Sequence, residues 1–335
     1  MSSTIVYVSN AESGDVHVLR LEPDGALVPL QQLALGGQVM PLAVSPDRRF
    51  LYAARRSEPL AALSMAIDPD TGRLRLLGEA PLPASMAHVA TDHGGRWLLS
   101  ASYGGNVVAV SPIGADGVAQ PARTPLPTPA NAHALRCAPG NRFAFSTALG
   151  GGQVMQWRFD AATGALTPND PPSLHARPGA GPRHLAFHPD GAVVYVLNEL
   201  DASVDVLALD REAGTLAPLQ TVSMLPPGFS GEPWAAELRL TPDAALLFCS
   251  ERRSSTLAAF RVGADGRLQP LGHAPTQAQP RGFAISPDGR FLVAAGQASH
   301  RLGVHAIDAA SGALTFLHEQ PVGRDPNWVE AIRLP

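Results

Sequence analysis

The chain has 335 residues, 45% of them hydrophobic and 16% charged, and a formal net charge of −4. Its 25 strongly basic residues are all arginine, so lysine nucleophiles and Schiff-base chemistry are excluded. The negative net charge argues against nucleic-acid binding, and no apolar run approaches the ~20 residues that span a membrane. The start of the sequence lacks a basic n-region, and two cysteines, Cys137 and Cys249, suit a reducing compartment. We therefore expect a cytoplasmic protein that binds neither nucleic acid nor membrane.

A tight turn followed by an apolar strand recurs along the chain. The first strand, "TIVYVSN" from Thr4, has no such turn before it, and six complete copies follow at spacings of 45 to 53 residues. They are "SPDRRFLYAA" from Ser45, "DHGGRWLLSA" from Asp92, "APGNRFAFST" from Ala138, "HPDGAVVYVL" from His188, "TPDAALLFCS" from Thr241 and "SPDGRFLVAA" from Ser286. The copy "TPDAAL" lacks the usual glycine of its turn.

A second series of turns is built around glycine. Its members read D-x-x-[ST]-G or D-G, with glycines at 25, 72, 117, 164, 214, 266 and 312. Flanked by alternating apolar residues, such turns predict hairpins in which the glycine adopts a positive φ. Four short strands in every ~45–50 residues are typical of a propeller blade. We therefore predict that residues 1–335 form a single all-β domain, a seven-bladed β-propeller with four antiparallel strands per blade.

The two ends of the chain are expected to share one blade. The segment "NWVEAIRL" resembles the strand that precedes the tight turn, which is the part that the N-terminal copy lacks. We therefore predict that residues 328–334 pair with residues 4–9, which closes the ring and leaves no long open strand edge.

Polar residues gather at one rim of the predicted central channel. In each blade the innermost strand runs to the tight turn and the second strand returns from it, so the start of the first and the end of the second lie on the face opposite the turns. These positions hold Met40, Ala87, His133, Arg183, Ala236, Arg281 and Asn327 before the turn, and Arg56, Tyr103, Leu149, Glu199, Arg252 and Gln297 after it. Because charged residues of separate blades share this rim, we predict a functional pocket at the channel mouth. His184 follows Arg183, and strand alternation predicts that the two side chains face opposite ways.

Several longer segments resemble a known family. "GPRHLAFHPDG" from Gly181, "VYVLNELDASVDV" from Val194, "EPWAAELRLTPD" from Glu232, "QPRGFAISPDGRFL" from Gln279 and "AAGQASHRLGVHAID" from Ala294 look like the 6-phosphogluconolactonases of the cycloisomerase-2 type. The resemblance implies a seven-bladed bacterial propeller of the pentose phosphate pathway. It also implies hydrolysis of 6-phospho-D-glucono-1,5-lactone without a cofactor. Fungal relatives of this family are carboxy-muconate lactonising enzymes.

The resemblance implies that His133, Arg183, Glu199 and Arg252 form the active site. We favour Glu199 as the general base and His133 as the acid at the leaving oxygen, with the reverse left open, and Arg183 at the oxyanion. Arg252 and Arg281 are expected to bind the 6-phosphate. The other candidates around the substrate are His184, His300, Gln297, Tyr103, Trp234 and Asn131; the last stands where many family members have a second histidine.

Three other interpretations remain at this point. The protein is an isomerase or cycloisomerase that acts on an anionic or unphosphorylated lactone, or it is a non-enzymatic interaction platform with a large exposed apolar patch. A calcium-dependent lactonase would use Glu199, Asn198, Asn131 and Asn327 as ligands, but the extended motifs favour a site without a metal. We expect a monomer or a weak homodimer.

Overall fold

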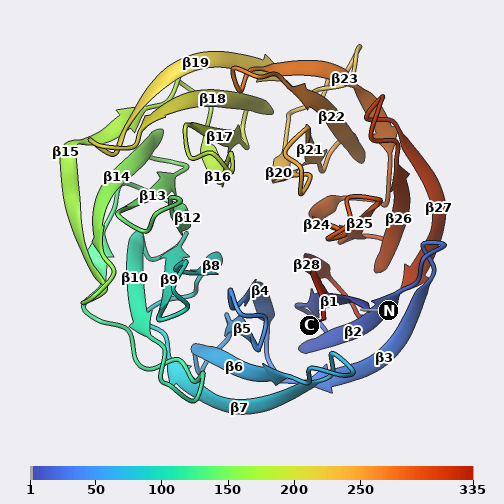
Figure 1. Cartoon of the computed structure of the whole chain (residues 1–335), viewed down its shortest axis with the longest axis horizontal. Coiled ribbons are helices and arrows are strands. Elements are labelled where there is room, and N and C mark those ends of the chain that lie inside the picture. The colour runs from blue at the N-terminus through green and yellow to red at the C-terminus, as the bar shows by residue number, and fades with distance from the viewer. Residues whose placement is uncertain (1–2, 335) are drawn as a thin grey trace.

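The computed structural model describes residues 3–334 and is a ring of seven antiparallel sheets with four strands each (Figure 1). The 28 strands account for every regular element in the described part of the chain. The predicted seven-bladed β-propeller is therefore confirmed. Within residues 3–334, no helix has the length and apolar character needed to cross a membrane.

Six of the seven blades run outward from the channel in chain order, and the last strand of the chain is the innermost strand of the closing blade. The innermost strands are β28 (Pro326–Arg333), β4 (Val39–Val44), β8 (His88–Thr91), β12 (Ala132–Cys137), β16 (Pro182–Phe187), β20 (Ala235–Leu240) and β24 (Pro280–Ile285). The second strands are β1 (Thr4–Asn10), β5 (Phe50–Arg55), β9 (Trp97–Ser102), β13 (Phe143–Ala148), β17 (Val193–Asn198), β21 (Leu246–Glu251) and β25 (Phe291–Gly296).

The two outer layers complete the blades. The third strands are β2 (Asp15–Leu21), β6 (Ala61–Ile67), β10 (Val107–Pro112), β14 (Gln153–Asp160), β18 (Ser203–Asp210), β22 (Thr256–Val262) and β26 (Arg301–Ile307). The outermost strands are β3 (Leu27–Ala34), β7 (Leu74–Pro81), β11 (Leu126–Pro127), β15 (Ala165–His175), β19 (Thr215–Ser223), β23 (Leu268–Pro275) and β27 (Leu314–Pro321). Strand β11 is short because the segment around it is rich in proline, which donates no backbone hydrogen bond to a neighbouring strand.

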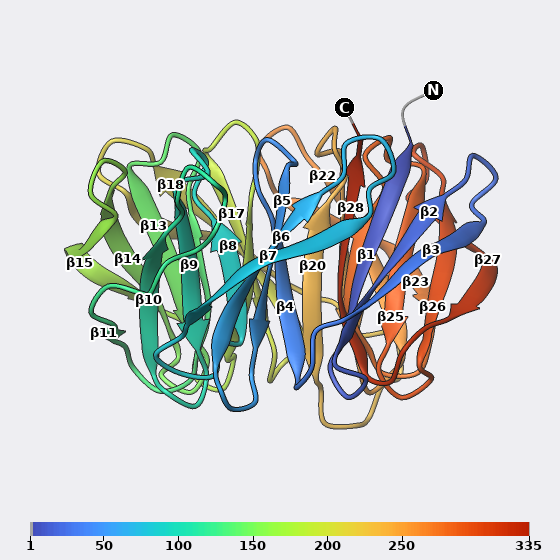
Figure 2. The same cartoon turned by 90° about the horizontal axis from the view of Figure 1, so that it is seen from below.

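The first and last strands pair and close the ring. Strand β28 runs antiparallel to β1, with Arg333 opposite Thr4 and Trp328 opposite Ser9. The two ends of the chain consequently lie beside each other in one blade (Figures 1 and 2). The predicted pairing of residues 328–334 with residues 4–9 is confirmed, and it replaces two open edges with one continuous sheet.

The glycine turns hold neighbouring blades together. All seven glycines of this series have a positive φ between 69° and 92°. A side chain at Gly117 would collide with the ring of Phe50 in the preceding blade, and Tyr52 of that blade donates a hydrogen bond to the Gly117 carbonyl at 3.0 Å. Tyr7 and Tyr195 make the same bond to the next blade's turn. The turn therefore needs glycine both for its φ and for the space that an aromatic ring occupies.

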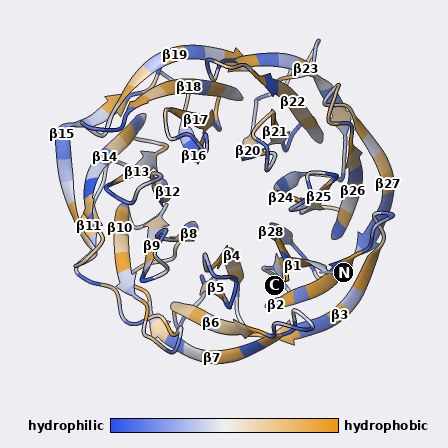
Figure 3. Ribbon diagram, viewed as in Figure 1, coloured by the Kyte–Doolittle hydropathy of each residue, from blue (hydrophilic) through white to orange (hydrophobic). Residues whose placement is uncertain are grey.

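The core lies between the blades. Apolar residues of facing sheets form clusters such as the one that contains Tyr7, Val18, Leu42 and Leu63. Strands β6 and β10 are mostly hydrophobic in Figure 3, since both of their faces are covered by neighbouring blades. The channel, in contrast, is lined by polar side chains at fixed positions of the innermost strands, and these form the site described next.

Candidate active site

Strand β16 carries a β-bulge where it enters the channel mouth. Pro182 pairs with Asn198 and His184 with Leu197, so Arg183 is an extra residue on its strand. The prediction that His184 faces away from Arg183 is therefore wrong, because a bulge interrupts the alternation of side chains. The Nη1 atom of Arg183 lies 3.2 Å from Nε2 of His184, and both residues are buried in the channel.

The same bulge recurs at the equivalent position of other blades. His133 in β12 and Arg281 in β24 are also the residues that the pairing register skips. In β28, Asn327 is skipped in the pairing with β1. The rim position that the repeat alignment identified is thus a bulge position, and bulges of this kind direct side chains toward a site.

Glu199 joins two arginines at the mouth. Its Oε2 lies 2.7 Å from Nε of Arg183 and 2.9 Å from Nη2 of Arg252. These two guanidinium groups lower the pKa of Glu199, against the effect of its burial, which alone would raise the pKa. Glu199 is therefore an ionised carboxylate that orients both arginines.

Trp234 covers this ion pair. The guanidinium carbon of Arg252 lies 3.8 Å from the centroid of the Trp234 ring, and the indole Nε1 donates a hydrogen bond to Oε1 of Glu199 at 3.2 Å. Arg252 also donates to the carbonyls of Trp234 and Ala235. The stacked ring excludes water and fixes the plane of the guanidinium. Burial and the charge of Arg183 lower the pKa of Arg252.

Arg281 completes a cluster with an excess of positive charge. Burial, followed by the charges of Arg183 and Arg56, lowers the pKa of Arg281, whereas Asp325 and Glu199 act to raise it. Within residues 3–334 its guanidinium has no hydrogen-bond or ion-pair partner, although its backbone carbonyl accepts from Ser250. We call Arg183, Glu199, Arg252 and Arg281 the mouth cluster. It holds three guanidinium groups and one carboxylate.

His133 lies beside the mouth cluster. Its ring centroid is 5.0 Å from that of His184 and 6.0 Å from that of Tyr103. Burial, followed by the charge of Arg183, lowers the pKa of His133 well below its ordinary value. Its Nδ1 is buried and has no hydrogen-bond partner among residues 3–334, so Nε2 is the ring nitrogen left to face a substrate. His133 is thus a neutral imidazole next to three arginines.

Four predicted residues lie around the rim and bond mainly to the loops. Tyr103 is 38% exposed at the mouth, and the carbonyl of Tyr103 accepts from Nδ2 of Asn131 at 3.2 Å. Gln297 donates to Asp325 at 2.6 Å, and Nδ1 of His300 accepts from the backbone of Asp325 at 3.2 Å. Gln297 and His300 therefore shape the loop that leads into β28, and among residues 3–334 their hydrogen bonds do not reach the mouth cluster.

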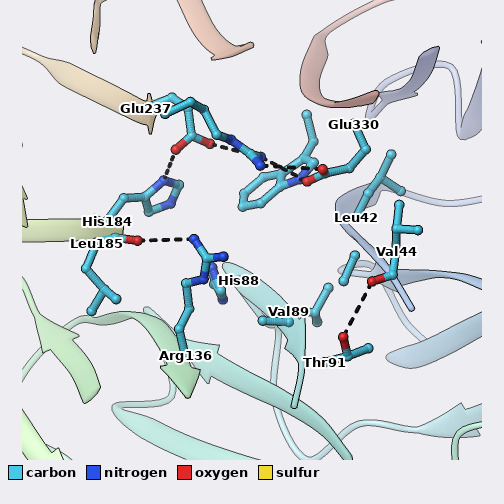
Figure 4. A pocket seen from close by; sticks show the side chains of 14 residues that line it. Leu42, Val44, His88, Val89, Thr91, Arg136, His184, Leu185, Glu237 and Glu330 are labelled. Carbon is cyan, nitrogen blue, oxygen red and sulfur yellow. Dashed lines mark hydrogen bonds and ion pairs between the residues drawn. The ribbon is translucent and has the colours of Figure 1, made fainter. Parts of the chain in front are cut away.

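A second polar cavity occupies the half of the channel nearest the tight turns (Figure 4). It encloses about 160 Å³. Arg136, Arg239 and Glu330 line it together with Glu237, His184, His88 and Trp328. Arg239 forms an ion pair with Glu330 at 2.9 Å, and Arg136 donates to the carbonyl of Leu185 at 3.2 Å.

The sequence analysis missed the three charged residues of this cavity. They stand two residues before the tight-turn position, where the same repeat alignment gives Ala43, Ala90, Arg136, Ala186, Arg239, Ala284 and Glu330. Three charged residues among four alanines were the available signal.

Comparison with known proteins identifies the family. Residues 4–331 match the family described as "Lactonase, 7-bladed beta-propeller". This chain belongs to the seven-bladed β-propeller lactonase family. Among relatives of this lactonase, the 6-phosphogluconolactonase of Serratia proteamaculans is 41% identical over 329 residues, which cover 98% of each chain. That of Yersinia pestis is 40% identical and covers 97% of this chain and 96% of the relative.

Solved structures of similar proteins superpose along the whole lactonase chain. The periplasmic gluconolactonase PpgL of Pseudomonas aeruginosa has a TM-score of 0.93 and 30% identity, and the alignment covers 99% of this chain and all of that one. A putative 6-phosphogluconolactonase of Bacteroides fragilis has a TM-score of 0.90 and 25% identity, with 99% and 98% covered.

Of the residues considered for a calcium site, Asn198 leaves its amide oxygen without a partner among residues 3–334, whereas Glu199 is paired with two arginines. Nδ2 of Asn198 bonds to Ser203 and Asp205 within its own blade, and Glu199 is held by the arginines of the mouth cluster. No group of three His, Cys, Asp or Glu side chains within the described range 3–334 is placed to hold a metal ion. Three guanidinium groups at the mouth also favour an anion over a cation.

Proposed function

We propose that this protein hydrolyses 6-phospho-D-glucono-1,5-lactone to 6-phosphogluconate, a step of the pentose phosphate pathway. Curated relatives of about the same length, 38% to 41% identical, carry the name 6-phosphogluconolactonase. The single observation that supports this most directly is the mouth cluster, in which three arginines and one carboxylate leave an excess of two positive charges. A phosphate monoester dianion would balance that excess.

The reaction adds water across the ring ester bond of the lactone. A water oxygen attacks the carbonyl carbon, the carbonyl oxygen becomes an oxyanion, and the ring oxygen leaves and takes up a proton. The groups needed are one that accepts the water proton and returns it to the leaving oxygen, and a cation at the oxyanion. His133 and Arg183 supply these groups side by side in the channel mouth.

The contacts of Glu199 favour His133 as the base, the alternative that the sequence left open, but they do not favour Glu199 as the acid. Both Glu199 oxygens already accept hydrogen bonds from Arg183, Arg252 and Trp234, so neither oxygen is free to accept a proton from water. His133 is neutral and carries no such bonds. In our proposal His133 takes the proton from water and delivers it to the leaving oxygen, while Glu199 holds Arg183 and Arg252 in place.

Arg281 is the main phosphate ligand in this proposal. Its guanidinium is free of hydrogen bonds to residues 3–334, whereas Arg252 already donates to Glu199 and two carbonyls. Arg252 therefore contributes mostly through its charge and Arg281 through direct hydrogen bonds. Trp234 and Tyr103 would form the walls of the substrate pocket.

The same site also suits an unphosphorylated substrate, which one structural relative supports. The Pseudomonas aeruginosa protein, 30% identical, is named a gluconolactonase. Gluconolactone would use His133 and Arg183 in the same way and would leave Arg281 without a partner.

The cytoplasmic location that we propose fits the two free, buried cysteines.

The test compares turnover of 6-phosphogluconolactone, gluconolactone and a muconolactone, with NMR identification of each product. We expect the phosphorylated lactone to give the highest kcat/KM and the open-chain acid as product. A new lactone as product would indicate an isomerase instead. Absence of turnover on all three would overturn the enzymatic proposal and leave the interaction platform. A His133→Gln variant with undiminished kcat would contradict the assigned base.

A further inference from the structure

His184 lies at the centre of the channel, between the mouth cluster and the polar cavity of Figure 4. It is 4% exposed. Its ring is 5.0 Å from that of His133, 5.6 Å from that of His88 and 5.5 Å from that of Trp328, all measured between centroids. His184 therefore contacts residues in both halves of the channel. Strand alternation alone predicts instead that its side chain faces away from that of Arg183.

Glu237 fixes the tautomer of His184. Oε1 of Glu237 lies 3.0 Å from Nδ1 of His184 and also accepts the backbone N–H of Leu238 at 2.9 Å (Figure 4). Burial acts to raise the pKa of Glu237, but Arg239, whose Nη2 lies 3.7 Å from Oε2, together with the hydrogen bond to His184 and the charge of Arg183, lowers it below its ordinary value, so the carboxylate is ionised and can only accept. Nδ1 of His184 must therefore carry the proton, and Nε2 has a free lone pair.

That lone pair faces Arg183. Nη1 of Arg183 lies 3.2 Å from Nε2 of His184 and also donates to the carbonyl of Ala236. On the other side, Nε of Arg183 bonds to Glu199 at 2.7 Å. The guanidinium is thus held at two of its three nitrogens, and Nη2 is left for a substrate oxygen.

We propose that His184 is a positioning residue for lactone hydrolysis: as the neutral tautomer fixed by Glu237, it holds Arg183 in the orientation that stabilises the oxyanion. The inference rests on the proposed function, because it assigns Arg183 to the oxyanion. His184 itself touches no reacting atom. Its contribution is to restrict where Arg183 places its free N–H groups.

The charges around His184 keep it in the form that this role requires. The groups that face it are Arg183 on its own strand, Glu237 and Arg239 on β20, Arg136 and His133 on β12, His88 on β8 and Glu330 on β28. Three guanidinium groups outnumber two carboxylates, and the site is buried, so an additional positive charge on the imidazole is disfavoured. An imidazolium would also place an N–H against the Arg183 N–H and break the contact.

A matched pair of variants separates the two sides of the imidazole. His184→Gln places a carbonyl oxygen near the position of Nε2 and keeps an acceptor for Arg183. His184→Asn places its amide near Nδ1, which keeps a partner for Glu237 but loses the acceptor. We expect His184→Asn to lower kcat about 10- to 100-fold with KM changed less than about 3-fold, and His184→Gln to restore kcat to within about 5-fold of the native value.

The control is His305→Asn. His305 is equally buried and is bonded through Nε2 to Thr276 at 3.0 Å, outside the channel mouth. The His305→Asn variant should lose thermal stability to a similar degree as His184→Asn, but its kcat should be unchanged. Equal kcat values for His184→Asn and His184→Gln would overturn the proposal, as would a loss of kcat in His305→Asn as large as that in His184→Asn.

A tautomer measurement on the native protein tests the proposal without a variant. Long-range ¹H–¹⁵N NMR of the histidine rings should assign His184 to the Nδ1-protonated tautomer at pH 7. A proton on Nε2 would overturn the proposal even if the variants fail to fold. The result does not depend on which lactone is turned over, so a failure of the proposed substrate and a failure of this positioning role are distinguishable.

Discussion

Arg252 and Glu199 form an ion pair at 2.9 Å in which the two side chains are only 2% and 12% exposed. Arg183 uses the same carboxylate oxygen at 2.7 Å. One buried carboxylate is therefore shared by two buried guanidinium groups that belong to different blades, and it offsets one of their two charges and orients both side chains.

Replacing Glu199 by Gln should therefore reduce both stability and activity. The variant leaves two buried arginines without a counter-charge, and breaking a buried pair in this way costs about 3–5 kcal/mol of unfolding free energy. We also expect kcat/KM to fall at least about 100-fold, because Arg183 loses an orienting partner. Urea unfolding and lactone turnover measure the two effects.

The matched control is Glu319→Gln. Glu319 pairs with Arg301 at 2.8 Å, but both side chains are more than 40% exposed. The change in unfolding free energy should stay within about 0.5–1 kcal/mol. Equal stability losses in the two variants would contradict the view that burial makes the Glu199 contacts important.

The repeat alignment predicted the fold and the rim position, but not the direction of every side chain. Turn residues and apolar strands have local signatures, so seven blades, the shared closing blade and the position of Arg183 follow from the sequence. The bulge at Arg183 has no such signature, because it reflects how β16 pairs with β17. His184 was therefore assigned to the wrong face.

The electrostatic roles of individual residues could not be predicted from the sequence either. The sequence favours Glu199 as the base and leaves the reverse assignment open. The pKa and hydrogen bonds of Glu199 depend on Arg183, Arg252 and Trp234, which come from other positions in the ring. Only the three-dimensional arrangement brings these groups onto one carboxylate.

Stability should fall as the pH decreases from about 6.5 toward 4. Burial lowers the pKa of His184 and of His305 to about 4, and it also lowers the pKa of His88 and of His133 well below the ordinary value. In this window the unfolded histidines bind protons that the folded ones do not, so unfolding is favoured as the pH falls. For His184 and His305 the shift of two and a half pH units corresponds to about 3 kcal/mol each.

Urea unfolding at pH 7, 5.5 and 4.5 measures this dependence. Below about pH 4.5 the lowered pKa values of Glu237 and Glu199 add to the loss, because their stabilisation is present only while they are ionised. His305→Asn removes one titrating group outside the site and should flatten the slope between pH 6.5 and 4. A midpoint that does not change between pH 7 and 4.5 would contradict the buried neutral histidines.

Ala244→Gly should stabilise the propeller. Ala244 has a φ of +56° in the tight turn "TPDAAL", where equivalent turns have glycine, such as Gly191 and Gly289, at φ of 72° and 73°. An alanine in this region is strained by about 1–2 kcal/mol, and glycine's greater freedom in the unfolded chain offsets part of the gain. We expect a net gain of roughly 0.5–1 kcal/mol, seen as a higher melting temperature.

The reverse change at the equivalent turn provides the control. Gly289→Ala should lower stability by a comparable amount, since the nearest atom to an added Cβ is 3.6 Å away and only φ is strained. Neither residue approaches the mouth cluster, so kcat should be unchanged in both variants. If Ala244→Gly destabilises the protein instead, the positive φ at residue 244 is not what limits the stability of this turn.

Arg281→Gln should separate phosphorylated from unphosphorylated substrates. The Arg281 guanidinium bonds to no residue within 3–334, so its removal deletes a ligand contact without breaking an ion pair. We expect KM for 6-phosphogluconolactone to rise about 10- to 100-fold, in line with the loss of a charge-assisted hydrogen bond, and KM for gluconolactone to change less than about 3-fold. Arg290, which lies at a tight turn on the opposite face and donates to the carbonyl of Pro23, gives the control variant Arg290→Gln. If Arg281→Gln raises KM by the same factor for both substrates, this arginine acts on the lactone itself. The phosphate must then be held elsewhere at the mouth.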